Sequence, residues 1–353
     1  MPSLEFNRRK FLGAAAALPL PAMAASLPAG AQETAAHGGH GQGGNIVVGE
    51  VDHAKNGFDP HAILTDWDAG ALTTDAAGRR TREWTLTAVD HEFEVAPGVT
   101  FAGWSYNGRI PGPTLRCTEG ERLRIRLINA SSHPHSMHFH GIHAARMDGV
   151  PGAGLVEPGG EFTYEFDARP FGCHHYHCHA IPLKRHIHKG LYGAFIVDPD
   201  PERHPAQREK AASRLLGAPE NGRWQELIMV MNGFDTNFDD ENEFYAVNSI
   251  PFAYFNRPIR IEKTRPVRIY LVNMTEFDPI NSLHLHANFF DFYDHGTTLE
   301  PTHRTIDTVM MCQAQRGILE FTFADHEPGL YMFHAHQSEF AELGWMSHFE
   351  VVA

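Results

Sequence analysis

The sequence contains little of what marks several common protein classes. Only four of its 353 residues are cysteine, too few for a disulfide scaffold. Positive charge is also scarce: 29 Lys and Arg stand against 43 Asp and Glu, and the formal net charge of −14 argues against a nucleic-acid partner. The most apolar stretch, which ends near Ala25, is short and interrupted by proline, so it does not suit a membrane span. We therefore expect neither nucleic acid nor a membrane among the partners.

The first residues of the chain have the pattern of an export signal. Arg8 and Arg9 precede a short, Ala-rich apolar segment. Twin arginines before such a segment are typical of Tat export. We predict that residues 1–31 are a Tat-type signal peptide, cleaved after Ala24 or Ala31, each of which ends an Ala-Xaa-Ala triplet. This predicts a periplasmic or secreted protein.

The rest of the chain predicts an all-β fold with two sandwich domains. Trp84–Val89, Leu123–Leu127 and Phe162–Phe166 alternate apolar and polar residues between Gly, Pro and Asn turns, as strands with one buried face do. A charged, proline-containing segment breaks this pattern and is expected to be a linker, with a short helix at Ala206–Leu216. The expected parts are an N-terminal extension at residues 32–80, domain 1 at 81–199, the linker at 200–223 and domain 2 at 224–353.

The second half of the chain repeats the first, which an internal duplication explains. The matched segments carry the same kinds of residue at the same spacing. They are Arg124–Asn129 with Arg268–Asn273, His135–His140 with Asn281–His286, and His177–His179 with His334–His336.

Two of these matched segments contain His-Xaa-His, so the motif occurs four times. On a β-strand, residues i and i+2 share a face, so each motif directs two imidazoles the same way. Imidazole is the commonest metal-ligand side chain and suits copper, zinc, iron and nickel. Eight imidazoles can surround three metal ions, and Cys178, the middle residue of one motif, is directed toward a different site. The eight are His138, His140, His177, His179, His284, His286, His334 and His336.

These motifs resemble those of a known family. The segments His135–Gly141 and His177–His179 are similar to the copper-binding motifs of laccases and other multicopper oxidases. The downstream segment His186–Val197 resembles the corresponding loop of copper nitrite reductases. The resemblance extends from about Trp84 to the C-terminus, and it implies two cupredoxin-like Greek-key β-sandwiches that bind copper.

The resemblance implies a mononuclear type 1 (blue) copper site in domain 1. Such a site needs one thiolate and two imidazoles in a trigonal plane, with a weak or absent axial ligand. The implied ligands are His135, Cys178 and His186. His188 is the alternative to His186, whose spacing to the following Gly-Leu fits the family better. Leu191 stands where many blue-copper proteins have methionine, and the loss of that thioether is expected to raise the reduction potential.

The same resemblance implies a trinuclear copper cluster, which brings the total to four coppers per subunit. His138 and His284 are expected to bind the type 2 copper, and the other six motif histidines the type 3 pair. Asp148 and Glu339 match the family's acidic residues near the cluster, where a carboxyl group can relay protons. Domain 2 is expected to lack a type 1 site, because different residues replace its ligands: Asn281, Ala335 and Phe340.

Half of the cluster ligands come from each domain, so the cluster is expected at a domain interface. In two-domain members of the family, domain 1 of one subunit faces domain 2 of the next in a head-to-tail homotrimer. A cluster within one chain is the alternative. Cys117, Cys173 and Cys312 are available for a disulfide whose pairing the sequence does not specify.

The expected function is that of a laccase-like oxidase. It would couple one-electron oxidation of phenolic, aromatic or metal-ion donors to the four-electron reduction of O2 to water. A copper nitrite reductase is one alternative, although its single catalytic copper needs no histidine after the cysteine, where this chain has His179. A copper-binding electron carrier without turnover is another. The chain has no long Met-rich insertion of the kind expected for cuprous-ion handling, so the reductant stays open.

Overall fold

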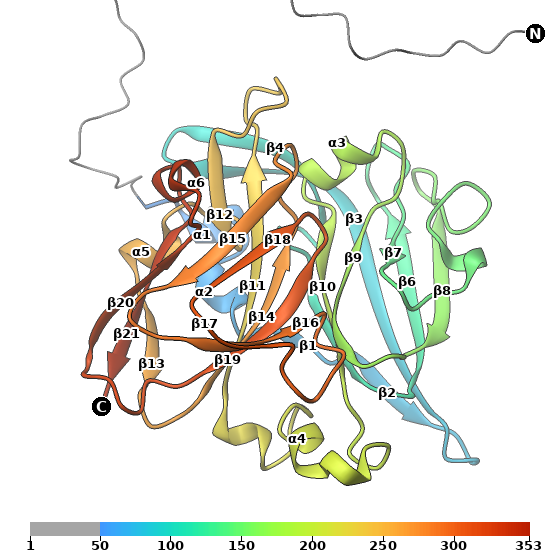
Figure 1. The fold of residues 1–353 in the computed structure, drawn as a ribbon. Helices are drawn as coiled ribbons and strands as arrows, with labels where there is room; N and C mark the ends of the chain where they lie inside the picture. Colours follow the sequence, from blue (N-terminus) through green and yellow to red (C-terminus); the bar gives the residue numbers. More distant parts are fainter. Residues whose placement is uncertain (1–49) are drawn as a thin grey trace, which may run out of the picture. The chain divides into compact units, whose positions relative to one another are not determined.

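The computed structural model describes residues 50–353, which fold mainly into β-strands (Figure 1). The predicted signal peptide, its two candidate cleavage sites and the first part of the expected N-terminal extension lie outside the described residues. No helix in the described part of the chain is long and apolar enough to cross a membrane. The strands form four sheets, two in each half of the described chain, so the predicted all-β fold with two sandwiches is confirmed.

Domain 1 contains two five-stranded sheets, and short strands from the expected N-terminal extension join both of them. The three segments predicted as strands lie in β3, β6 and β8. In one sheet the order is β1 (Trp67–Asp68), β5 (Thr114–Thr118), β10 (Tyr192–Asp198), β9 (Gly172–His177) and β7 (His138–Phe139). In the other it is β2 (Ala71–Thr74), β3 (Arg80–Ala96), β6 (Arg122–Asn129) and β8 (Glu161–Asp167), with β4 (Val99–Tyr106) paired to β3.

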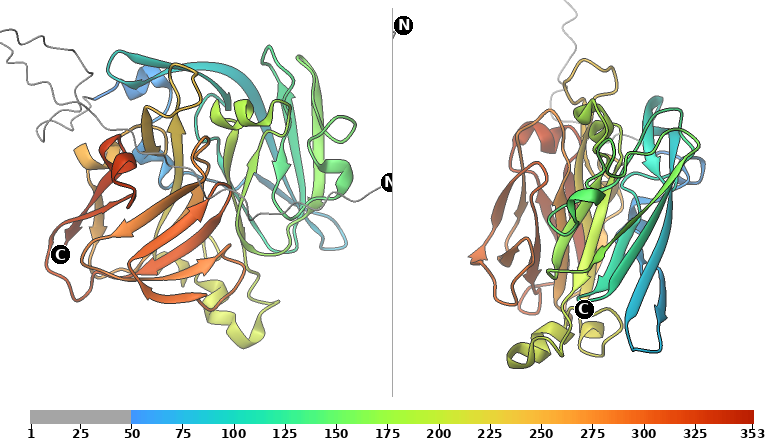
Figure 2. Two further views of the ribbon diagram at one scale, coloured as in Figure 1. Left: turned by 45° about the horizontal axis from the view of Figure 1, so that its top comes forward. Right: turned by 90° about the vertical axis from the view of Figure 1, so that its right-hand side faces the viewer.

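Domain 2 repeats this plan with a six-stranded and a five-stranded sheet. The six-stranded sheet has the order β12 (Phe244–Val247), β11 (Gln225–Phe234), β14 (Val267–Asn273), β19 (Arg316–Phe321), β16 (Phe290–Asp294) and β17 (His303–Ile306). The five-stranded sheet has the order β13 (Ile259–Glu262), β21 (Met346–Val352), β20 (Gly329–His334), β15 (Ile280–Leu285) and β18 (Thr308–Cys312). The right-hand view of Figure 2 shows the sheets of both domains edge-on.

The two strands from the duplicated Arg-rich segments show how burial differs between the domains. In β6, Leu123, Ile125 and Leu127 are buried while Arg124 and Arg126 face solvent, so the alternating sequence builds a strand with one apolar face. The matching strand β14 is buried along its whole length. One face of β14 belongs to the core of domain 2, and the other packs into a third cluster of apolar side chains drawn from both domains.

Buried charges also join the two domains. Arg116 of β5 donates to Asp198 of β10 at 2.9 Å and to Glu226 of β11 at 2.8 Å. Arg268 of β14 donates to the same Glu226 at 3.0 Å and to Glu320 at 2.7 Å. Charges removed from water need such partners, because an unpaired buried charge costs several kcal/mol. This alternation of arginines and carboxylates therefore fixes β5 and β10 of domain 1 beside β11 and β14 of domain 2.

Short helices fill the connections between strands, and α3 follows the end of β9 directly at the Cys178 loop (Figure 1). The helix expected at Ala206–Leu216 is present but shorter, as α4. The α-helices are α1 (His53–Asn56), α2 (Pro60–Ile63), α3 (Leu183–His188), α4 (Arg208–Ala212), α5 (Ala253–Asn256) and α6 (Ser338–Glu342). The 3-10 helices are η1 (Ala145–Met147), η2 (Pro205–Gln207) and η3 (Asn221–Arg223).

Candidate metal centres

Three buried side chains of domain 1 converge in a His2Cys group. The Sγ atom of Cys178 lies 3.3 Å from Nδ1 of His186 and 3.9 Å from Nδ1 of His135. The two Nδ1 atoms are 3.2 Å apart. Each residue thus directs one donor atom at the same small volume, as the sequence predicted for a type 1 site.

Local backbone contacts hold these ligands in place. Cys178 follows the last residue of β9, and its N–H donates to the carbonyl of Leu191 at 2.9 Å. The N–H of Ser136 donates to the sulfur at 3.3 Å. His186 lies on α3, whereas Nε2 of His188 on the same helix accepts from the N–H of Asp235 in domain 2 at 3.1 Å. The geometry therefore favours His186 over His188 as the third ligand.

The electrostatics of this group suit a soft metal ion. Burial lowers the pKa of His135 to about 3 and that of His186 to about 4, so both imidazoles stay neutral and keep a free lone pair. Burial also raises the pKa of the Cys178 thiol to about 11. A bound metal ion would displace this thiol proton. Two imidazoles and one thiolate in a buried trigonal set are the donor set of blue copper.

The four motif histidines of domain 1 gather in a second group, at the edge formed by β7 and β9. His138 and His177 lie opposite each other in the register of these strands. Nε2 of His140 is 2.8 Å from Nε2 of His177, and Nδ1 of His177 lies 2.8 Å from the Cys178 carbonyl oxygen. The ring of His179 lies 5.0 Å from that of His138. The Nδ1 hydrogen bond leaves Nε2 of His177 free to bind a metal.

Domain 2 builds the same arrangement from its own motifs. His284 and His334 lie opposite each other in the register of β15 and β20. Nε2 of His286 is 2.9 Å from Nε2 of His334, whose Nδ1 is 2.6 Å from the carbonyl oxygen of Ala335. The rings of His284 and His336 are 5.2 Å apart. The duplicated sequence therefore gives two half-sites with matching orientation of their imidazoles.

The two half-sites lie apart within residues 50–353 of a single chain. Among the groups of potential ligand atoms lying within 4.8 Å of one another, one contains His138, His140 and His177 of domain 1, and another contains His284, His286 and His334 of domain 2. In residues 50–353, no group of potential ligand atoms lying within 4.8 Å of one another combines histidines from both half-sites.

The two predicted acids differ in how they are held. Oδ1 of Asp148 is 3.1 Å from Nδ1 of His138 and 3.5 Å from Nε2 of His143, so it lies beside the domain 1 half-site. Glu339 is exposed in the first turn of α6, which begins two residues after His336. Asp148 therefore contacts a motif histidine directly, whereas Glu339 follows His336 by three residues and faces solvent.

The place that corresponds to the type 1 site in domain 2 is filled by other contacts. Asn281 donates from Nδ2 to Oγ1 of Thr275 at 2.9 Å. Ala335 is fully buried, and the ring of Phe340 stacks on Tyr245 with centroids 3.9 Å apart. These side chains offer no thiolate or imidazole, in agreement with the prediction of a type 1 site in domain 1 only.

The three cysteines that were available for a disulfide are unpaired in the structure. Cys117 and Cys173 are buried as free thiols, and Cys312 is exposed and free. The structure also adds two histidines that the sequence did not single out as functional. His143 lies beside Asp148, and the ring of fully buried His175 contacts that of His140 in a tilted arrangement, with ring centroids 3.8 Å apart. His175 lies two residues before His177 on β9, so the period-two rule that identified the ligands also directs it toward them.

Comparison with known proteins agrees with this architecture. Two family models, each described as multicopper oxidase, match residues 88–202 and 226–353. A solved structure titled as that of a multicopper oxidase is 51% identical, with a TM-score of 0.76; the match covers 86% of this chain and all of that one.

Curated relatives match over shorter segments. A copper-containing nitrite reductase of Neisseria meningitidis is 31% identical over 116 residues, which is 32% of this chain and 30% of that protein. Laccase-18 of Oryza sativa subsp. japonica is 34% identical over 151 residues, 40% of this chain and 24% of that protein. The matches thus span less than a third of each of these two proteins, one named as a nitrite reductase and the other as a laccase.

Proposed function

The chain belongs to the multicopper oxidase family, and we propose that it is a laccase-like oxidase that couples one-electron oxidation of a small donor to reduction of O2 to water. The observation that carries the proposal is the pair of matched half-sites, with four imidazoles in each domain. A nitrite reductase or an electron carrier needs no second set of four. Phenolic, aromatic-amine and metal-ion donors are all compatible with the site.

The chain's own residues divide the work between two places. His135, Cys178 and His186 would hold a type 1 copper that accepts single electrons from the donor. Cys178 is bonded to His177, the last residue of β9, and to His179, so the covalent backbone would connect the thiolate ligand of such a copper to two ligands of the half-site. Copper supplies one-electron redox chemistry, and the buried histidines supply neutral ligands that need not lose a proton before binding it.

Reduction of O2 to two waters consumes four electrons and four protons. The motif histidines act as ligands and leave proton delivery to other groups. Asp148 lies 3.1 Å from Nδ1 of His138 and is partly exposed, so it can pass protons between solvent and the half-site. Glu339, exposed near His336, would act from the domain 2 side.

We also propose that three chains assemble head to tail, with each trinuclear cluster between domain 1 of one subunit and domain 2 of the next. The separation of the half-sites within one chain supports this arrangement. Because each subunit would present a different face to each neighbour, the interface is heterologous, and it closes a ring of three when the rotation between neighbouring subunits is one third of a turn. Export through a Tat signal at residues 1–31, to the periplasm or beyond, is part of the same proposal and is testable by N-terminal sequencing of the mature protein.

Copper content and acceptor use distinguish this function from its alternatives. We expect four coppers per chain, an intense blue absorption band, and O2 uptake with a phenolic or aromatic-amine donor that exceeds any nitrite consumption. A copper nitrite reductase would bind two coppers per chain and turn over nitrite instead. An electron carrier would be reduced by the donor without consuming O2. Light scattering should give the mass of three chains, and a copper-loaded active monomer would contradict the shared cluster.

A further inference from the structure

His135 is the start of a hydrogen-bond chain that leads away from the predicted type 1 site. Its Nε2 atom lies 2.9 Å from Oγ of Ser131. The Ser131 hydroxyl donates to Oδ1 of Asp90 at 2.6 Å. Asp90 is exposed on β3, while His135 and Ser131 are buried, so the chain connects a ligand of the site to a carboxylate at the surface.

The direction of these hydrogen bonds follows from the donor and acceptor capacity of each group. Nδ1 of His135 faces Cys178 and His186, so the proton of the neutral imidazole resides on Nε2. Nε2–H then donates to the Ser131 oxygen, and the Ser131 hydroxyl donates to Asp90, which only accepts when ionised. The side chains of His135, Ser131 and Asp90 thus all find hydrogen-bond partners in one arrangement, and that arrangement fixes the tautomer of His135.

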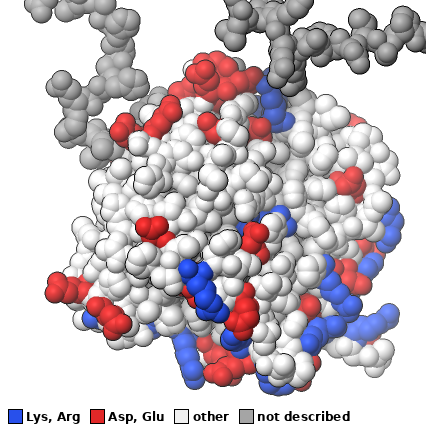
Figure 3. Space-filling model, in the orientation of Figure 1, with Lys and Arg blue, Asp and Glu red and all other residues white. Residues whose placement is uncertain are grey.

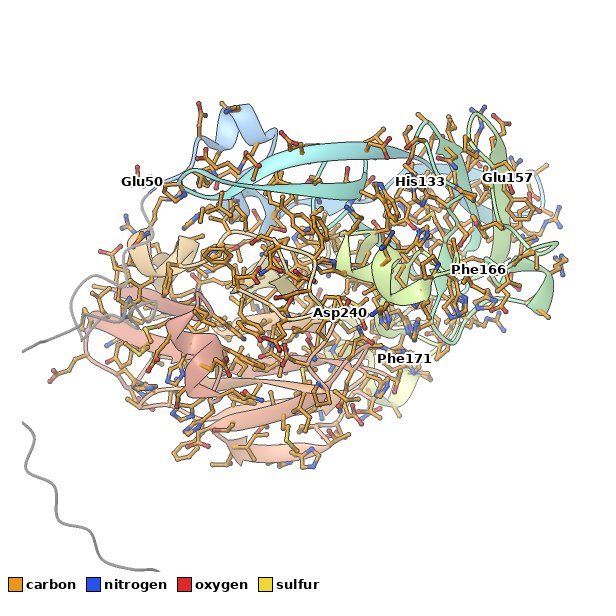
Figure 4. The ribbon with its side chains drawn as sticks, turned by 90° about the horizontal axis from the view of Figure 1, so that it is seen from above. Glu50, His133, Glu157, Phe166, Phe171 and Asp240 are labelled. Atoms are coloured by element: carbon orange, nitrogen blue, oxygen red, sulfur yellow. The ribbon has the colours of Figure 1, made fainter. Side chains whose placement is uncertain are left out.

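The carboxylate of Asp90 is held at both oxygens. Ser132 donates to Oδ2 from its N–H at 3.2 Å and from its hydroxyl at 2.9 Å. Partial burial opposes ionisation of Asp90, but the hydrogen bonds from Ser131 and Ser132 outweigh it and lower the pKa of Asp90. The group is therefore a fixed negative charge at neutral pH. The ring of nearby His133 packs against Trp104 in a tilted arrangement, with ring centroids 4.7 Å apart (His133 is labelled in Figure 4).

Domain 2 provides an internal comparison for this chain of contacts. A hydroxyl stands at the matching place in domain 2: Thr275, which corresponds to Ser131, accepts from Asn281, which corresponds to His135. The carboxylate does not remain. In domain 1, Ala88 pairs with Asn129, and Asp90 lies two residues after Ala88. In domain 2, Met231 pairs with the matching Asn273, and the residue two positions after Met231 is Gly233. Gly233 therefore corresponds to Asp90. The acid is thus present in the domain that has the His2Cys group and missing from the domain that has lost it.

We propose that Asp90 and Ser131 are positioning residues for the type 1 copper site, and that they orient His135 and lower the reduction potential of copper bound there. Outer hydrogen-bond partners fix the orientation of a ligand histidine and increase its basicity. A fixed negative charge at the end of the chain favours Cu(II) over Cu(I) and so counteracts the potential-raising effect expected from Leu191. This inference rests on the type 1 site of the proposed function.

The test compares two variants that lose the same charge. Asp90→Asn keeps the shape of the side chain, and Glu92→Gln removes a carboxylate from an exposed position two residues along the same strand. In the copper-loaded full chain, we expect Asp90→Asn to retain the blue band and to shift the electron-exchange equilibrium with a redox mediator about tenfold toward reduced copper, ~59 mV for a one-electron couple. Glu92→Gln should shift it by less than half as much. Equal shifts of the reduction potential in the two variants would mean that any lost surface charge has the same effect, and would overturn the proposal.

Ser131 variants test the bridge while the charge of Asp90 remains. Ser131→Ala should raise the potential and alter the copper hyperfine splitting in the electron paramagnetic resonance spectrum. Ser131→Thr, which copies Thr275 of domain 2, should restore the wild-type values. If Ser131→Ala does not fold, the Asp90→Asn and Glu92→Gln pair decides. Unchanged potential and spectrum in Ser131→Ala would refute the relay, but a blue wild-type protein would leave the proposed function intact. A wild-type chain without a blue band would overturn both.

Discussion

Cys178 and His177 are consecutive residues whose side chains join different groups. Sγ of Cys178 lies 3.3 Å from His186, and Nε2 of His177 lies 2.8 Å from His140. Nδ1 of His177 is also 2.8 Å from the Cys178 carbonyl oxygen. The end of β9 thus connects the His2Cys group to the domain 1 half-site through one peptide unit and one hydrogen bond. In domain 2 the matching residue Ala335 has no sulfur, so the connection is present once per chain.

Replacing Cys178 by serine should remove the blue band and the oxidase activity and leave the copper of the trinuclear cluster bound. The reason is that Cys178 faces away from the imidazoles of His177 and His179. Copper analysis with visible absorption would show about three coppers per chain and no intense blue band. An undiminished blue band in this variant would refute the role of Cys178.

Replacing His336 by alanine should stop O2 reduction while donors still bleach the blue copper. His336 belongs to the domain 2 half-site, whereas the type 1 ligands all come from domain 1. Stopped-flow reduction without oxygen, followed by mixing with O2, would show normal bleaching and failed recovery of the colour. His284→Ala should behave in the same way. Exposed His303 on β17 offers a matched control, and turnover at the wild-type rate in His336→Ala would contradict a shared cluster.

Periodicity and duplication predict most of the fold because they depend on local sequence. The alternation in β6 identifies a strand with one buried face, and the repeated segments identify a second sandwich. The joining of β1 and β2 to domain 1 could not be predicted, since two- and four-residue strands are too short to show a period. The complete burial of β14 was equally hidden, because it results from the packing of the other domain against its outer face.

The features of the site likewise separate into those that local sequence predicts and those that depend on contacts between distant residues. The motif histidines and Cys178 follow from the i, i+2 geometry of a strand, which the sequence displays directly. The spacing to the following Gly-Leu favoured His186 over His188 already in the sequence, and the structure adds a second reason that the sequence does not show: the N–H of Asp235, a residue of the other domain, is 3.1 Å from Nε2 of His188. The chain from His135 to Asp90 was also out of reach, because 45 positions along the sequence separate residues that the β3 and β6 pairing brings together.

An acidic loop of domain 2 lies next to α3 at the surface. Figure 3 shows acidic side chains gathered at the top of the view, where Figure 1 has the loop between β11 and β12. That loop contains the exposed Asp239, Asp240 and Glu241, and Asp240 pairs with Lys184 of α3. The helix that holds His186 is therefore anchored from domain 2 at its surface side as well as through His188. The Lys184–Asp240 pair is exposed and therefore contributes little free energy, so the buried hydrogen bond between Asp235 and His188 is the stronger of the two contacts.

His174 should make folding stability fall as the pH drops from 6.5 to about 4. Burial lowers the pKa of His174 from 6.5 to about 4 in the folded chain, so protonation favours the unfolded chain within that window, and the stabilising contribution is complete only above pH 6.5. Relative to His174→Gln, which can still donate to the Pro170 carbonyl, the wild type should lose about 2 kcal/mol of unfolding free energy at pH 5. Denaturant titrations at pH 7 and pH 5 measure this difference.

The control for this prediction is His303→Gln, since that side chain is exposed. It should leave the difference between pH 7 and pH 5 as in the wild type. The other buried histidines are present in both proteins of each comparison, so their contributions to the stability difference cancel. If His174→Gln loses as much unfolding free energy as the wild type between pH 7 and pH 5, the pH dependence of stability comes from a residue other than His174.

Glu339→Gln should slow turnover by about 10²-fold with little change in copper content or colour, the lower end of typical acid–base contributions. Glutamine keeps the shape and hydrogen-bonding capacity of the side chain but has no proton to give. Reduction of the blue copper by donor should proceed at the wild-type rate, because that step delivers no proton to oxygen. Steady-state O2 uptake and single-turnover reoxidation of the fully reduced protein separate the two steps.

Glu342→Gln is the matched control, because Glu342 lies on the same short helix, at its opposite end. If proton delivery depends on the position of Glu339 at the first turn of α6, beside the domain 2 half-site, the control should turn over normally and only Glu339→Gln should reoxidise slowly. Slow reoxidation should also carry a solvent isotope effect larger than that of the wild type, since a proton transfer would then limit the rate. Normal reoxidation in Glu339→Gln would make that residue a solvated surface acid and would leave Asp148, 3.1 Å from His138, as the remaining predicted acid for the cluster.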